Sequence, residues 1–497
     1  MSKTVVVIGS GFAGLSAASF MAKAGWDVTV IEKNETAGGR ARQLKEDGFT
    51  FDMGPSFYWM PDIFERYFEK FGKKVSDYYT LKRLDPSYRI FWNDGMTDIP
   101  ADFNELKKVF ESFETGSAAK LEQYLEGAAY KYEAGMKKLV FKPGRSLTEF
   151  LDWQTISGVF KLQVFSSIKK HIAHYFQHPK LRQMMEFPVL FLGALPQDTP
   201  ALYSLMNYAD IKGGTWYPQS LSRQGGSGMY AVVEGMYKLA MEQGVKFHFE
   251  EEVNGIHIRG NKAATIATTK DIYRADVIIS GADYHFTETK LLPEECRSYS
   301  DAYWKKRVMA PSCLLYYVGL NKRLKQPSHH SLFFDVPFEQ HAKEIYKDPQ
   351  WPAEPLFYVS VPSVTDVSVA PPGHENIVFL VPVASGLEGD TEELREKYFQ
   401  VIVRRMEKHM GESILDSVVY KKTYSVSDFV HDYNSFRGNA YGLANTLRQT
   451  AIFRPSCRSK KVKNLFYTGQ LTVPGPGVPP SLVSGEVVAK EVIKAYG

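Results

Sequence analysis

The chain has 497 residues, enough for two or three domains or for one large interleaved fold. Its 60 basic and 56 acidic residues leave a formal net charge of +4 without a block of like charge, so nucleic acid is not an expected partner. The three cysteines, Cys296, Cys313 and Cys457, form no CxxC pair, so neither a disulfide framework nor a metal site is expected.

The first residues and the longest apolar runs bear on where the protein works. Thr4 leads directly into an apolar strand and then into glycines, rather than into the hydrophobic region and cleavage site of a secretory signal. Apolar runs such as Ile377–Ala384 are far shorter than the roughly 20 residues that a spanning helix needs. We therefore expect a cytoplasmic protein, either soluble or attached peripherally to a membrane.

The N-terminal segment has the pattern of a dinucleotide-binding β-α-β unit. Residues 5–32 read VVVIGSGFAGLSAASFMAKAGWDVTVIE, so Gly9, Gly11 and Gly14 form a GxGxxG motif directly after an apolar strand. These glycines permit a tight turn, close approach of a pyrophosphate and close helix packing, and the helix N-terminus directs N–H groups at phosphate. Glu32 ends the second strand, where a carboxylate can accept a hydrogen bond from a ribose 2′-hydroxyl.

A second glycine-rich segment indicates which dinucleotide is bound. Gly38, Gly39 and Arg40 follow the second strand and offer backbone donors together with a bidentate phosphate contact. This segment resembles the GGR extension that follows the FAD motif in the flavin amine oxidase and desaturase superfamily. The expected cofactor is therefore FAD.

Further segments resemble the bacterial carotenoid desaturases, especially the phytoene desaturases that form lycopene. Phe51–Ser56 (FDMGPS) is similar to the FDxGP segment of that family, and Asn464–Gly485 (NLFYTGQLTVPGPGVPPSLVSG) is similar to its C-terminal signature. The resemblance covers nearly the whole chain and includes Ala275–Asp283 (ADVIISGAD), Pro362–Asp366 and Asn434–Leu443.

The resemblance implies an α/β fold with a discontinuous, Rossmann-like FAD-binding domain of the amine oxidase type. An inserted, mixed α+β substrate domain and a helical, membrane-facing part complete the expected architecture. We expect the cofactor domain in residues 1–100, 225–300 and 455–497, the helical part in 101–224 and the substrate domain, with its mixed sheet, in 301–454.

The resemblance also implies a set of cofactor-binding residues. Gly469 and Gln470 would lie at the ribityl-phosphate end, and Val253 would pack near adenine. A helix opened by Val478 and Pro479 would direct its N–H groups at the flavin pyrimidine, where a positive helix end stabilises the charge of a reduced flavin. The expected cofactor-binding residues are Gly9, Gly11, Ala13, Gly14, Glu32, Lys33, Gly39, Arg40, Gly54, Pro55, Ser56, Val253, Asp283, Gly469, Gln470, Val478 and Pro479.

The implied reaction turns a single bond of a linear carotenoid precursor, phytoene on the way to lycopene, into a double bond. A hydride leaves an allylic carbon for the flavin, and a proton leaves the neighbouring carbon. A long apolar polyene needs an apolar tunnel, which an aromatic content of 14% suits. Oxygen or a quinone is the expected electron acceptor. The alternatives are a later-acting carotenoid desaturase or oxidase, a diapophytoene desaturase, a carotenoid isomerase, an amine oxidase and a non-catalytic carotenoid carrier.

The proton acceptor is not evident from the sequence. Some family members carry an Asp/Arg pair in the region equivalent to Ser146–Trp153, which reads SLTEFLDW here. Glu149 is the candidate base, and a solvated helix face is the alternative interpretation. His329 and His330 are either polar groups of the tunnel or exposed loop residues, with exposure favoured. Water or the flavin itself could also take the proton.

Two segments remain open to more than one interpretation. Gly158–Phe176 (GVFKLQVFSSIKKHIAHYF) has the pattern of a basic amphipathic helix, which either lies on an anionic bilayer or packs its apolar face into the core. The insolubility of the substrate favours the bilayer. After Trp216, the aromatic-Pro-x-Gly-Gly turn of the family is replaced by an apparent insertion at 220–227, either an exposed excursion or a change at the tunnel entrance.

Overall fold

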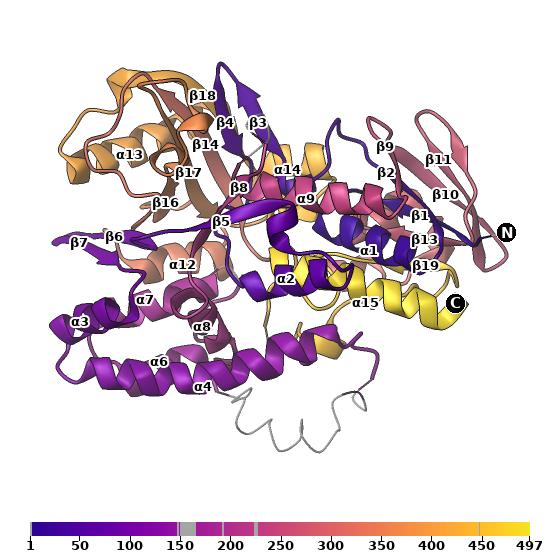
Figure 1. The fold of residues 1–497 in the computed structure, drawn as a ribbon, viewed down its shortest axis with the longest axis horizontal. Coiled ribbons are helices and arrows are strands. Elements are labelled where there is room, and N and C mark those ends of the chain that lie inside the picture. The colour runs from indigo at the N-terminus through magenta and orange to yellow at the C-terminus, as the bar shows by residue number, and fades with distance from the viewer. Residues whose placement is uncertain (1, 147–148, 150–165, 191–192, 223–226, 447) are drawn as a thin grey trace.

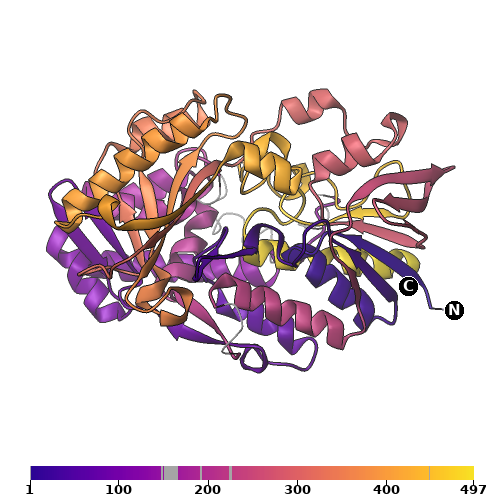
Figure 2. The same ribbon diagram turned by 90° about the horizontal axis from the view of Figure 1, so that it is seen from above.

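The protein forms two lobes, with both chain termini in the same lobe (Figures 1 and 2). The structure is a computed structural model that describes residues 2–146, 149, 166–190, 193–222, 227–446 and 448–497. The lobe that holds the termini is built on a parallel sheet, and the other lobe is built on a larger mixed sheet with a layer of helices beneath it in the view of Figure 1.

A five-stranded parallel sheet, in the order β19-β13-β1-β2-β9, forms the centre of the first lobe. Its strands come from three separate parts of the chain, so the expected discontinuous Rossmann-like fold is confirmed. The sheet is buried on both faces, as is usual for parallel sheets: Val5 and Val7 face one core, and Val6 and Ile8 face another. The strands are β1 (Thr4–Ile8), β2 (Asp27–Ile31), β9 (Lys246–His248), β13 (Val277–Ser280) and β19 (Leu465–Tyr467).

Helices cover one face of this sheet, and a small antiparallel sheet packs on the other. Gly485 lets α15 cross α1 closely, because a Cβ at Gly485 would overlap the carbonyl oxygen of Ala13. The Ser16 hydroxyl also donates to Leu482 O at 2.7 Å across the same contact. The helices are α1 (Phe12–Lys23), α9 (Met229–Glu242) and α15 (Val478–Tyr496), and the antiparallel strands are β10 (Val253–Arg259), β11 (Lys262–Thr268) and β12 (Ile272–Tyr273).

The second lobe contains a seven-stranded sheet in the order β18-β14-β17-β16-β15-β6-β7. All neighbours pair antiparallel except β15 and β6, which run parallel. The strands are β6 (Tyr88–Trp92), β7 (Gly95–Ile99), β14 (Ser312–Leu320), β15 (His330–Phe333), β16 (Phe357–Ser360), β17 (Glu375–Val383) and β18 (Val418–Tyr424). Two of its strands, β6 and β7, come from within residues 1–100, the expected first segment of the cofactor domain.

A helical layer lies beneath the mixed sheet in Figure 1. Its helices are α3 (Phe103–Phe113), α4 (Ser117–Lys137), α6 (Ile168–Tyr175), α7 (Pro179–Leu190) and α8 (Leu205–Ile211). In α6, Ile168 and Ile172 are fully buried, so the described part of the amphipathic segment packs its apolar side into the core. Residues 158–165 of that segment lie outside the described residues.

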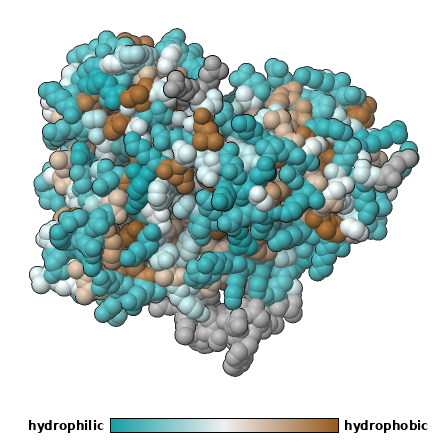
Figure 3. Space-filling model, viewed as in Figure 1, coloured by the Kyte–Doolittle hydropathy of each residue, from teal (hydrophilic) through white to brown (hydrophobic). Residues whose placement is uncertain are grey.

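The remaining elements connect these layers. They are β3 (Gln43–Glu46), β4 (Phe49–Asp52), α2 (Pro61–Glu69), β5 (Tyr79–Arg83), β8 (Trp216–Ser220), α10 (Tyr284–Phe286), α11 (Asp301–Lys305), α12 (Phe338–Tyr346), α13 (Glu392–Met410) and α14 (Val426–Tyr433). Within the described residues, no helix has the length and apolar character needed to span a bilayer. The face shown in Figure 3 is largely hydrophilic, with apolar residues scattered over it in small groups.

Candidate active site

A cavity of about 700 Å³ extends from the glycine turn of the first lobe to α12 of the second. All seventeen residues that the sequence predicts to bind the cofactor line this cavity, although they come from six separate parts of the chain. We call the part of the cavity that these residues line the cofactor end. Binding by each of these residues stays a prediction.

The turn between β1 and α1 forms the floor of the cofactor end. Gly9 has φ +90°, and a Cβ at Gly14 would overlap the carbonyl oxygen of Gly9, so both positions require glycine. A Cβ at Gly11, in contrast, would meet no protein atom within 4 Å. No side chain caps the N-terminus of α1, and its backbone N–H groups therefore face a space that a phosphate group fits.

Glu32 is held in place at one edge of the cofactor end, where its side chain is buried. Its Oε2 accepts hydrogen bonds from the backbone N–H and the hydroxyl of Ser10, both at 2.8 Å. Its Oε1 accepts from the backbone N–H of Asn34 at 2.9 Å and from the Asn34 side chain at 2.8 Å. Rotation of the Ser10 or the Asn34 side chain would free a lone pair of the Glu32 carboxylate for a ribose hydroxyl.

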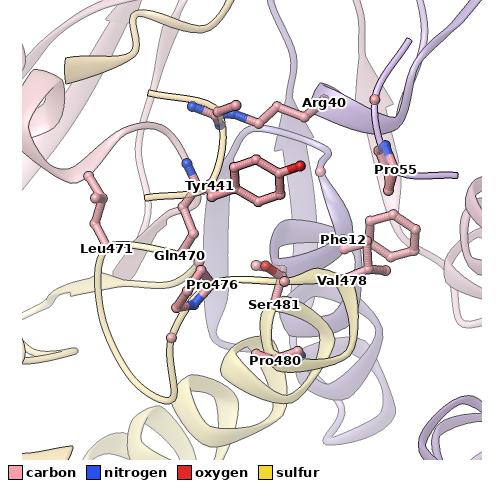
Figure 4. Close-up of a pocket in the computed structure, with 18 of the residues that line it drawn as sticks. Phe12, Arg40, Pro55, Tyr441, Gln470, Leu471, Pro476, Val478, Pro480 and Ser481 are labelled. Carbon is pink, nitrogen blue, oxygen red and sulfur yellow. The ribbon is translucent and has the colours of Figure 1, made fainter. Parts of the chain in front are cut away.

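Arg40 supplies a positive charge to the cofactor end, and Figure 4 shows it above Tyr441. Its Nη2 donates to Ser435 Oγ at 3.0 Å and to Asn439 O at 3.2 Å, while its buried Nε has no partner among the described residues. Burial lowers the pKa of the guanidinium, and the nearby Asp283 opposes that shift. A buried cation with an unused donor fits an anionic group such as a phosphate.

The C-terminal loop closes the cofactor end, as Figure 4 shows for the segment from Gln470 to Ser481. Its first part is tied to α15, because Gly469 N donates to Ser484 Oγ at 2.9 Å. The helix α15 begins at Val478, as expected. However, Pro479 and Pro480 carry no N–H, and Ser481 N donates to Gly477 O, so the first turn offers the Val478 N–H alone rather than several donors.

Beyond the cofactor end, the cavity continues as an apolar arm between the mixed sheet and the helical layer. Sequence patterns do not single out the residues of this arm, since apolar side chains there resemble those of any core. The arm can accommodate a long hydrocarbon, because its lining offers few polar groups. Its apolar lining residues include Met136, Phe187, Leu202, Leu205, Met206, Leu332, Phe334, Phe338, Ala342, Ile345, Leu356, Phe357 and Leu380.

Comparison with known proteins identifies the family of the chain. A family model described as flavin containing amine oxidoreductase matches residues 12–493. The chain is 42% identical over 492 residues to the carotenoid 3,4-desaturase of Haloarcula japonica, covering 99% of this chain and 98% of that protein. It is 30% identical to the zeta-carotene-forming phytoene desaturase of Myxococcus xanthus, covering 99% and 94%.

The chain belongs to the carotenoid desaturases of the flavin-containing amine oxidoreductase family. It is therefore a flavin-dependent oxidoreductase. Solved structures agree at the level of the fold. An oxidoreductase from Methanosarcina mazei matches with a TM-score of 0.63 at 17% identity, covering 98% of this chain and 100% of that one. A variant of putrescine oxidase matches with a TM-score of 0.62 at 13% identity, covering 99% of each chain.

The candidate base Glu149 is not among the residues that line the cavity. Its two carboxylate oxygens accept backbone hydrogen bonds from Gly144 at 2.9 Å and from Arg145 at 3.1 Å. The carboxylate therefore caps a turn, and a role for it as a base stays a prediction. The described residues of the apparent insertion, 220–222 and 227, also lie outside the lining, and 223–226 fall outside the described residues.

The expectation that His329 and His330 are exposed loop residues is wrong. Their exposed fractions are 5% and 0%, because His330 begins β15 inside the mixed sheet rather than lying in a loop. The His330 Nδ1 lies 2.6 Å from the hydroxyl of Tyr358, which lines the cavity. Tyr358 cannot be recognised from the sequence, because no local motif marks a tyrosine that meets a histidine 28 residues away.

Proposed function

We propose that the chain is an FAD-dependent desaturase of a linear carotenoid, with conversion of phytoene to lycopene as the first candidate reaction. The observation that carries this proposal is a single cavity that joins a cofactor end rich in glycine and backbone donors to an apolar arm. FAD is favoured because both Glu32, at the ribose side, and Val478, on the C-terminal helix, line this cavity, as a cofactor with an adenosine half and a flavin half requires.

The proposed contacts follow from the geometry of the cofactor end. Gly11 and the N-terminus of α1 would receive the pyrophosphate, and Arg40 would add a charged donor to it. Glu32 would bind the adenosine ribose, and Val253 would pack against adenine. The Val478 N–H would reach the flavin ring. When bound, FAD supplies a two-electron acceptor for a hydride.

In this reaction, the chain itself contributes position and the exclusion of water. The apolar arm would hold the polyene extended, with one allylic C–H directed at the cofactor end. A hydride that leaves this carbon leaves a positive charge on the substrate, and water in the arm would trap such a cation. The apolar lining formed by residues such as Phe187, Leu332 and Leu380 keeps this part of the cavity dry.

A second candidate reaction is desaturation at the 3,4 position of a carotenoid. Identity to the Haloarcula japonica carotenoid 3,4-desaturase is 42%, compared with 30% for the phytoene desaturase of Myxococcus xanthus and for the 4,4′-diapophytoene desaturases of Staphylococcus. The two candidates differ in the substrate that enters the arm and not in the chemistry at the cofactor end. The same variants of the cofactor end would therefore affect both reactions.

We further propose that the protein takes its substrate from a membrane surface in the cytoplasm and passes electrons to a quinone or to oxygen. The support is the insolubility of carotenoids in water. The helix α6 adds no support, because its apolar residues Ile168 and Ile172 are buried in the core. Sedimentation with vesicles of anionic lipid checks the membrane step. Protein that stays in the supernatant at low salt would contradict it.

The substrate is tested by expressing the chain in cells that accumulate phytoene and, separately, in cells that accumulate lycopene. Chromatography and absorption spectra of the extracted pigments then identify the products. Lycopene in the first cells supports phytoene desaturation, and a longer conjugated product in the second supports 3,4-desaturation. Flavin-loaded protein that changes neither pigment would contradict carotenoid desaturation, and a change of isomer without new double bonds would indicate an isomerase.

A further inference from the structure

A row of hydrogen-bonded polar side chains interrupts the apolar wall where the cofactor end meets the apolar arm. The hydroxyl of Tyr358 lies 2.8 Å from Ser56 Oγ and 2.6 Å from His330 Nδ1. Ser56 and Tyr358 line the cavity, and His330 lies behind them, fully buried. The Tyr358 hydroxyl therefore links a group in the cavity to an imidazole in the sheet.

The register of the mixed sheet fixes this arrangement. Strands β15 and β16 pair antiparallel, with His330 opposite Ser360 and Leu332 opposite Tyr358. Side chains two residues apart share a face of a sheet, so His330 and Tyr358 are diagonal neighbours on the face that carries Leu332 toward the cavity. The ring of Phe57 stacks on His330, with ring centroids 4.1 Å apart.

His330 is incompletely hydrogen-bonded for a buried residue. Its Nε2 has no hydrogen-bond partner in the part of the chain that the structure describes. Whichever nitrogen carries the proton, one buried ring nitrogen stays unpaired, which lowers the stability of the folded state. Burial also lowers the pKa of His330 well below its usual value, so that the imidazole is neutral near pH 7. A costly feature of this kind calls for a functional reason.

His329 forms a second polar pair, with Thr365, beside His330. The ring of His329 lies edge-on to that of His330, with centroids 4.4 Å apart. The Nδ1 of His329 is 2.6 Å from the hydroxyl of Thr365, which is partly exposed. Another histidine, His341, lines the cavity but has both ring nitrogens paired, because its Nε2 meets Pro382 O and its Nδ1 accepts from Leu356 N.

We propose that Tyr358 takes the proton that the carotenoid loses, and that His330 receives the hydroxyl proton of Tyr358. This inference rests on the proposed desaturation. After a hydride has left one carbon for the flavin, the C–H bond of the neighbouring carbon breaks, and its electron pair forms the new double bond. The proton passes to the Tyr358 oxygen as the Tyr358 O–H proton passes to His330 Nδ1. After the product has left, the imidazolium returns its Nδ1 proton to the Tyr358 oxygen as the Tyr358 O–H proton passes to Ser56 Oγ, and the Ser56 hydroxyl proton passes to water in the vacated cavity.

A neutral tyrosine and imidazole pair suffices as the acceptor in this step. A C–H bond next to a carbocation is a far stronger acid than a protonated imidazole, even one whose basicity is reduced by burial. The same reduced basicity favours rapid release of the proton afterwards. General base catalysis of this kind contributes about 10²- to 10⁴-fold to a rate.

Two substitutions separate proton transfer from simple packing. Tyr358→Phe removes the hydroxyl and keeps the ring. His330→Asn keeps a hydrogen-bonding atom near the position of Nδ1 but removes the basic group. Tyr58→Phe is the matched control, because the buried Tyr58 hydroxyl bonds to Tyr79 at 3.0 Å outside the cavity lining. Each flavin-loaded variant is assayed with carotenoid deuterated either at the carbon that loses the hydride or at the carbon that loses the proton.

We expect Tyr358→Phe and His330→Asn to lower kcat about 100-fold with KM, flavin content and melting temperature close to wild type. The isotope effect should grow at the carbon that loses the proton, because that step becomes rate-limiting. Tyr58→Phe should keep the wild-type kcat. The inference is overturned if both variants keep kcat within about threefold, or if they lose activity with an unchanged isotope effect at that carbon. A wild-type protein that forms no double bond refutes the proposed function instead, and the inference falls with it.

Discussion

The two ends of the cavity are built from different parts of the polypeptide. The cofactor end consists largely of backbone, namely the glycine turn after β1 and the first turns of α1 and α15, together with charged side chains that include Arg40 and Glu32. The apolar arm consists of side chains carried by strands and helices of the other lobe. A site that depends on backbone approach tolerates few residue types, whereas a site that depends on apolar volume tolerates many.

The largest expected effect comes from adding a single methyl group at the cofactor end. Gly11→Ala introduces a Cβ that meets no protein atom within 4 Å, at a residue with an ordinary φ of −69°. The variant should fold, but its methyl group occupies the space where the pyrophosphate approaches the backbone. We expect flavin affinity to fall about 100-fold, measured as flavin content and by titration of apoprotein with FAD.

A glycine in a helix of the other lobe provides the control for this substitution. A Cβ at Gly127 of α4 would also meet no protein atom within 4 Å, so Gly127→Ala should leave flavin affinity unchanged. The same substitution should stabilise the helix by up to about 1 kcal/mol. Full flavin content in Gly11→Ala would contradict the proposed cofactor site.

Arg40→Lys should have the next largest effect. Lysine keeps the charge but loses the planar donor group whose Nε is unpaired in the described structure. We expect FAD to bind about ten times more weakly, with little change in the melting temperature of the apoprotein. An unchanged dissociation constant, measured by calorimetry, would show that Arg40 acts within the fold and not on the cofactor.

A bulky residue in the apolar arm should separate the two ends. Ala342 is a buried residue of α12 that lines the arm. Ala342→Trp should lower kcat/KM for the carotenoid about tenfold or more, because the larger ring fills the arm, while flavin content stays at the wild-type level. Loss of flavin in a folded variant would contradict the separation between the two ends.

The smallest effect is expected at Glu149. Its carboxylate caps the turn at Gly144 and Arg145, so Glu149→Gln should keep kcat within about twofold of wild type and change mainly the stability of this turn. Steady-state assays of the variant beside wild type check this expectation. A fall of about 100-fold in kcat would restore Glu149 as the candidate base.

The same contrast explains what could be predicted from the sequence. The glycines at 9, 11 and 14, Glu32 and Arg40 are predictable from the sequence because each occupies a fixed place relative to a strand or helix end, and all of them line the cavity. Pro479 and Pro480 are also evident from the sequence. Because proline carries no backbone N–H, the resemblance to a helix-end motif overstates the number of N–H groups that the start of α15 offers.

Features that depend on sheet register were not predictable from local patterns. Tyr88–Ile99 joins the mixed sheet through a parallel pairing with β15, more than 200 residues further along the chain. Likewise, His330 meets Tyr358 only because β15 and β16 pair in one register, and no local sequence pattern marks that register.

The most direct test is a single turnover of flavin-loaded protein with carotenoid in vesicles, in the absence of oxygen and other acceptors. Flavin absorbance reports reduction, and chromatography of the extract reports new double bonds. We predict one new double bond for each flavin reduced, with no further product until a quinone or oxygen is added, because each double bond requires a two-electron acceptor. A changed carotenoid with the flavin still oxidised, or a flavin that stays oxidised beside unchanged carotenoid, would contradict flavin-dependent desaturation.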